Sequence, residues 1–149
     1  MVIESGRHLR SHGHPAHAAS FLRERRMVFD CTRSEFPRIF VHELFHFVWL
    51  RAGNPARARW EQLLVREFQG GARGELGWSA EWRKQALAAH DRPSRSRRWR
   101  EYCCESFCDT AAWLYSGADR HPEFTLATRF RAGRRSCFQI TFAGARLPL

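Results

Sequence analysis

Residues 38–51 constrain the fold more than any other part of this chain, because they are typical of a helix with apolar residues on every side. The apolar members are Ile39, Phe40, Val41, Leu44, Phe45, Phe47, Val48, Trp49 and Leu50. A helix that is apolar all round is a buried helix. The chain has 149 residues, which is one domain with room for a core of this kind.

The same segment contains an HExxH motif, formed by His42, Glu43 and His46. Residues four apart share a helix face, so both imidazoles can point at one tetrahedral ion. Glu43 is offset by about 100° and can reach a water that this ion activates, which is the arrangement of a general base beside a Zn²⁺ site. The alternative is two core histidines bonded to backbone carbonyls, with Glu43 in an ion pair.

A zinc site of this kind requires a third protein ligand and an open fourth position. The long helix predicted over about residues 97–116 is the better source of that ligand. Its carboxylates Glu101, Glu105 and Asp109 are four apart, so they stack on one face and repel one another unless they share a cation. The alternative is a surface face whose carboxylates pair with the neighbouring arginines.

Taken together, these two segments resemble the zincin metallopeptidases of the glutamate-ligand (gluzincin) type. HELFH (42–46) matches the active-site helix of that family. ESFCD (105–109) is similar to its second helix, often written E-x-F-A-D/E-x-x-A, with Cys108 at the small-residue position and Ala112 at the later one. The resemblance implies a fold in which these two helices face each other across a zinc ion.

The resemblance also implies a role for each matching residue. The implied zinc ligands are His42, His46 and Glu105. Glu43 would be the catalytic general base, and Asp109 would hold a ligand histidine by its second ring nitrogen. In a rival register, Glu101-x-x-Cys104-Glu105, Glu101 would be the ligand and Glu105 its outer partner. We prefer Glu105, because more of the following positions then match the family pattern.

The rest of the chain is mostly helical in pattern, with a strand predicted at 27–31 and a second helix after Pro55. A shorter helix is expected from Ser79 to about residue 90, and residues 137–142 fit a strand or a short helix. We therefore expect an α+β fold: a mainly helical, zincin-like minimal metalloprotease domain with a small β-sheet. It would occupy residues 26–149, after a basic His/Arg-rich segment at 1–25.

The net charge is +10, and almost all of the positive charge is arginine. A basic balance suggests acidic partners such as nucleic acid. Residues 92–100 place five arginines beside Trp99, a combination that can bind phosphates and stack a base. The alternatives are a solvated helix start, or a surface that attracts an acidic protein substrate.

No uncharged apolar stretch of about 18 residues is present, and the N-terminal residues lack the apolar core of a signal peptide. The five cysteines are odd in number, which favours free thiols in a reducing compartment. We therefore expect a cytoplasmic protein without membrane contact. The glycine-rich segment 70–77 could be a lid over a cleft or a plain connector.

The function predicted from these features is a zinc-dependent metallopeptidase, with a protein or peptide substrate. The candidate donors to the oxyanion of such a reaction are Tyr102, Tyr115, His90 and His121. The alternative is a zincin-fold regulatory or nucleic-acid-binding protein whose zinc is structural or vestigial.

Overall fold

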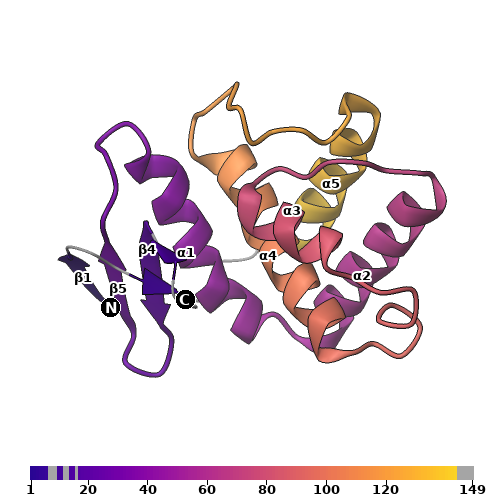
Figure 1. The fold of residues 1–149 in the computed structure, drawn as a ribbon, viewed down its shortest axis with the longest axis horizontal. Helices are drawn as coiled ribbons and strands as arrows, with labels where there is room; N and C mark the ends of the chain where they lie inside the picture. Colours follow the sequence, from indigo (N-terminus) through magenta and orange to yellow (C-terminus); the bar gives the residue numbers. More distant parts are fainter. Residues whose placement is uncertain (7–9, 12–13, 16, 144–149) are drawn as a thin grey trace.

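The computed structural model describes residues 1–6, 10–11, 14–15 and 17–143 (Figure 1). The helices in this part of the chain are α1 (Phe36–Arg51), α2 (Asn54–Gln69), α3 (Trp78–Gln85), α4 (Arg97–Tyr115) and α5 (Thr128–Phe142). The strands are β1 (Val2–Ser5), β2 (Arg10–Ser11), β3 (His14–Pro15), β4 (Ala18–Phe21) and β5 (Arg26–Phe29).

A three-stranded sheet with the order β1-β5-β4 precedes the helices. β5 pairs in parallel with β1, where Ile3 lies opposite Met27, and antiparallel with β4, where Ser20 lies opposite Met27 from the other side. β5 is the central strand because its residues 27–29 are apolar and buried. β2 and β3 form a separate two-stranded ribbon.

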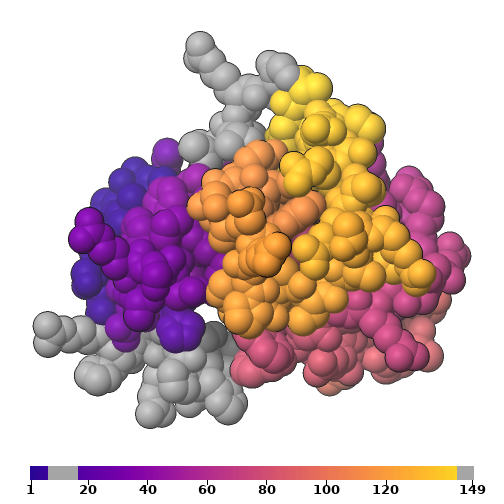
Figure 2. All heavy atoms as spheres, turned by 90° about the horizontal axis from the view of Figure 1, so that it is seen from above, coloured from indigo at the N-terminus to yellow at the C-terminus, as the bar shows by residue number. Residues whose placement is uncertain are grey.

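α1 lies between this sheet and the remaining helices, which explains why it is apolar on every side (Figure 1). On the sheet side, Ile39 and Phe47 pack with Met27 of β5. On the opposite side, Phe45 and Val48 join the larger helical core. In the space-filling view, β4, β5 and α1 lie on one side of the molecule and the later helices on the other (Figure 2).

α4 is the central helix of the larger core and packs closely on α1. Ser96 begins it, because the Ser96 hydroxyl accepts a hydrogen bond from the Trp99 backbone N–H at 3.2 Å. Gly117 follows its end with φ +78°, a conformation that glycine adopts without strain. The Phe107 ring stacks on Phe138 of α5 at a centroid distance of 4.7 Å.

A buried ionic network joins α2, α4, α5 and the segment before α3. The Arg134 guanidinium is fully buried and lies 2.7 Å from a carboxylate oxygen of Glu67 and 2.7 Å from one of Glu75. The Tyr102 hydroxyl donates to Glu75 Oε1 at 2.6 Å, and Lys84 Nζ lies 3.0 Å from the same oxygen. Buried charges require such partners, so this network fixes how the helices meet.

The α+β, mainly helical fold is as predicted, and the two motif-bearing helices lie within two residues of the expected bounds. The predicted strand at 27–31 is β5, one to two residues earlier. Residues 137–142, which were expected to form a strand or a short helix, are the end of the longer helix α5. The helix expected to reach residue 90 ends earlier, at Gln85.

Two further segments had no single predicted structure. Residues 1–25 show no clear period, yet Val2–Ser5 and Ala18–Phe21 form the outer strands of the sheet. In the glycine-rich segment 70–77, for which a lid and a plain connector were both open, Glu75 and Leu76 are buried. Among the described residues, no helix is both long and apolar enough to cross a membrane.

Candidate metal centre

His42 and His46 of α1 face Glu105 of α4 across the contact between the two helices. His42 Nε2 lies 3.3 Å from Glu105 Oε2, and His46 Nε2 lies 3.9 Å from the same oxygen. One donor atom from each of the three residues lies within 4.8 Å of the other two. The helical spacing of four places both rings on the face that meets α4.

These separations can be compared with those of a zinc site. Ligands at about 2.0–2.1 Å for nitrogen and about 2.0–2.2 Å for oxygen, at tetrahedral angles, lie about 3.3–3.5 Å apart. The His42 to Glu105 separation of 3.3 Å already matches, and the His46 separation of 3.9 Å closes with a small side-chain movement. Two imidazoles and one carboxylate are a donor set that zinc accepts, so the residues fit the ion.

Asp109 fixes the orientation of His42. Its Oδ1 lies 2.7 Å from His42 Nδ1, and its Oδ2 accepts a hydrogen bond from the Ala80 backbone N–H at 2.9 Å. A carboxylate only accepts, so Nδ1 carries the proton and Nε2 is directed at Glu105. Gly77 lies against the same carboxylate, where a Cβ atom would collide with it.

The charges around the cluster favour an ionised Glu105. Burial alone would raise the pKa of Glu105, but hydrogen bonding to His42 and the nearby positive charges lower it to about 2. Burial likewise opposes protonation of His42, yet the Asp109 carboxylate raises its pKa well above the usual value. Arg83 of α3 lies 3.1 Å from Glu105 Oε1, which leaves Oε2 for the histidines.

Glu43 is buried, and its carboxylate is held by the edge strand β4. The Ser20 hydroxyl lies within hydrogen-bond distance of Glu43 Oε2 and, at 3.2 Å, of the Glu43 backbone carbonyl. Ser20 therefore orients the residue predicted as general base.

The second ring nitrogen of His46 faces sulfur. The thiols of Cys104 and Cys108 each lie 3.5 Å from His46 Nδ1. The hydrogen bond with Cys108, followed by those with His46, lowers the pKa of the Cys104 thiol. All five cysteines are free thiols.

The structure separates the two registers proposed for the third ligand. The Glu101 side chain is exposed and lies 2.7 Å from Arg97 on the surface of α4. Glu105 is the carboxylate that meets both histidines. Of the three carboxylates spaced four apart on α4, Glu101 therefore lies on the surface, whereas Glu105 and Asp109 contact the histidines.

The other candidates from the sequence lie away from the cluster. Tyr102 donates to Glu75, Tyr115 stacks on Phe45, and His121 lies 3.2 Å from Glu35. The fourth oxyanion candidate, His90, is exposed beside Asp91.

The arginine-rich segment 92–100 does not offer its aromatic ring to a base. Trp99 is buried in the core, and two of the arginines pair with carboxylates: Arg95 with Glu61 and Arg97 with Glu101. The side chains of His8, His12 and His14 in the basic N-terminal segment lie outside the described residues.

Sequence reasoning missed Ser20, Arg83 and the contact between His46 and the thiols of α4. Ser20 lies 23 residues before its partner Glu43, and Arg83 lies 22 residues before its partner Glu105. No local sequence pattern indicates either contact. The thiols did carry a signal, because Cys104 and Cys108 are four apart on the ligand helix and flank Glu105.

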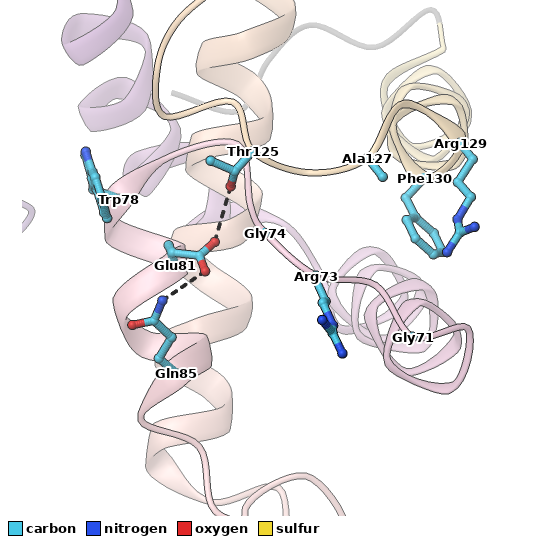
Figure 3. A pocket seen from close by; sticks show the side chains of 10 residues that line it. All are labelled: Gly71, Arg73, Gly74, Trp78, Glu81, Gln85, Thr125, Ala127, Arg129 and Phe130. Carbon is cyan, nitrogen blue, oxygen red and sulfur yellow. Dashed lines mark hydrogen bonds between the residues drawn. The ribbon is translucent and has the colours of Figure 1, made fainter.

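A pocket of about 570 Å³ lies on another part of the surface, between α3 and the start of α5 (Figure 3). Trp78, Glu81 and Gln85 line one side, while Arg73 and Arg129 lie on the other. Glu81 is held there by Thr125 and Gln85. The pocket lining includes none of the histidines, cysteines or carboxylates of the candidate metal cluster.

Comparison with family models, with curated proteins and with solved structures finds no match to this chain. The assignment of the site therefore depends on its own geometry and chemistry.

Proposed function

We propose that the protein is a zinc-dependent metallopeptidase. The observation that carries the proposal is the convergence of His42, His46 and Glu105 from two packed helices, with Asp109 behind His42. Two neutral nitrogen donors and one carboxylate, with a position left open, are the ligand pattern of catalytic rather than structural zinc.

Each residue of the site has a distinct task in this proposal. His42, His46 and Glu105 would hold the ion, which when bound polarises a carbonyl and lowers the pKa of water. Glu43 would accept the proton of the attacking water and pass it to the leaving amine. Asp109 would keep His42 in the tautomer that presents Nε2.

A peptide substrate is supported by the position of β4. This strand pairs with β5 on one side and has no partner strand among the described residues on the other. It also carries Ser20, which contacts Glu43. An extended peptide could add to that edge through backbone hydrogen bonds, which would bring its carbonyl groups close to Glu43.

The net charge of +10 would favour an acidic protein or peptide as the substrate. A cytoplasmic location belongs to the same proposal, because a reducing compartment would keep the five thiols free.

The test combines zinc content with cleavage of a peptide library read by mass spectrometry. Wild-type protein should hold one zinc ion and cleave, Glu43→Gln should hold zinc without cleaving, and His42→Ala should lose the ion. Glu101→Gln is the matched control, because Glu101 is an exposed carboxylate on the same helix as Glu105. Zinc retained by His42→Ala, or equal cleavage by Glu43→Gln, would overturn the proposal.

A further inference from the structure

His46 contacts potential metal ligands through both nitrogens of its ring. Nε2 faces Glu105, as described above. Nδ1 faces the thiols of Cys104 and Cys108, which lie one helical turn apart on α4. The second set of donor atoms also lies within 4.8 Å of one another, so the chain contains two overlapping clusters that share one imidazole.

The thiol cluster already has the spacing of a metal site. For a tetrahedral ion with a metal–sulfur distance of about 2.3 Å and a metal–nitrogen distance of about 2.0–2.1 Å, sulfur and nitrogen lie about 3.6 Å apart. Both sulfur to nitrogen separations at His46 are 3.5 Å. The two sulfur atoms also lie within 4.8 Å of each other, so the three donor atoms are close enough to converge on one ion.

We propose that His46 Nδ1, Cys104 Sγ and Cys108 Sγ form a second metal site, selective for soft cations of the Cu(I) or Cd(II) kind. Two thiolates and one imidazole are soft donors, in contrast to the carboxylate of the first cluster. His46 and Cys104 are only half-buried, which gives an ion a route from solvent, while Cys108 closes the inner side.

A neutral His46 imidazole can serve only one of the two sites at a time, a consequence that rests on the proposed zinc function. A neutral imidazole has one lone pair, because its other nitrogen carries a proton. When Nδ1 binds a soft cation, the proton moves to Nε2 and faces Glu105. The first cluster then loses one of its two nitrogen ligands, so a soft cation bound at the thiols would displace zinc.

The test is a Cd²⁺ titration of the metal-free, reduced protein, followed by the ultraviolet absorption of cadmium–thiolate charge transfer. This band reports bound thiolate and is silent for ions held by carboxylate and imidazole alone. Wild-type protein should develop the band to a plateau at one equivalent. Glu105→Gln removes the carboxylate of the first cluster and should keep the band. The thiol site is therefore tested independently of the proposed zinc site.

Variants at the cysteines decide the assignment. Cys104→Ala combined with Cys108→Ala should abolish the band, with helical content by circular dichroism as a check on folding. Cys103→Ala is the matched control, because Cys103 is also buried on α4 but has Glu61 and Arg95 as its charged neighbours. The proposal would be overturned if the wild type gave no band, if the band survived in the double variant, or if Cys103→Ala lost it equally. The contacts at His46 would then be ordinary hydrogen bonds between thiol and imidazole.

Discussion

Replacing Asp109 with asparagine should weaken both the metal-free fold and zinc binding. The carboxylate accepts two buried hydrogen bonds, from His42 Nδ1 at 2.7 Å and from the Ala80 N–H at 2.9 Å. Asparagine has the same shape but only one acceptor oxygen, so one of the two donors must face its NH₂ group. If that donor is His42, the ring is driven to the tautomer that protonates Nε2, the nitrogen required by zinc.

The size of each effect follows from these contacts. A buried donor left without an acceptor costs about 1–3 kcal/mol, which should appear as lost stability of metal-free Asp109→Asn in urea unfolding. Loss of an outer partner of a ligand histidine weakens metal affinity by about 10–100-fold. That is about 1.4–2.8 kcal/mol of binding free energy, measured by competition with a chelator.

The control for this prediction is Asp119→Asn, the same change at an exposed carboxylate. It should leave stability and zinc affinity at wild-type values. Zinc affinity of Asp109→Asn within about threefold of the wild type would refute the view that Asp109 orients His42 for the ion.

Three further changes test the surroundings of the site. Gly77→Ala should lower zinc affinity about tenfold, because its Cβ displaces the Asp109 carboxylate, whereas Gly133→Ala within α5 should not; equal affinities would contradict this. Arg134→Met should cost about 3–5 kcal/mol in urea unfolding, because it leaves two buried carboxylates without their guanidinium; a loss below about 1 kcal/mol would count against the network. In metal-free protein, the pKa of Glu105 is lowered from 4.5 to about 2, so its contribution to stability is present above pH 4.5 and is lost as the pH falls towards 2. Glu105→Gln should therefore flatten the stability profile across that range in urea midpoints, and an unchanged slope would oppose the assignment.

The elements that carry the motifs were predictable because their signals are local. An HExxH motif inside an all-apolar helix fixes both the buried position of α1 and the shared face of His42 and His46. The family resemblance then selected Glu105 over Glu101, and the structure places Glu105 beside the histidines. The helix and its shared face follow from periodicity and spacing, whereas the choice of Glu105 also needed the family resemblance.

The remaining parts depend on contacts between distant segments, which leave no local pattern. The outer strands within residues 1–25 gain their partner only when β5 lies between them. The sequence around Arg134 does not distinguish it from a surface arginine, yet it is fully buried between Glu67 and Glu75. Ser20 likewise gains its role only where β4 meets α1.

The proposed metal centre is tested most directly by anomalous diffraction at the zinc absorption edge, from crystals of the full chain grown with one equivalent of zinc. We expect a single ion bound by His42 Nε2, His46 Nε2 and Glu105, with metal–nitrogen distances of about 2.0–2.1 Å. No ion at this position, or an ion held by Glu101 instead, would contradict it.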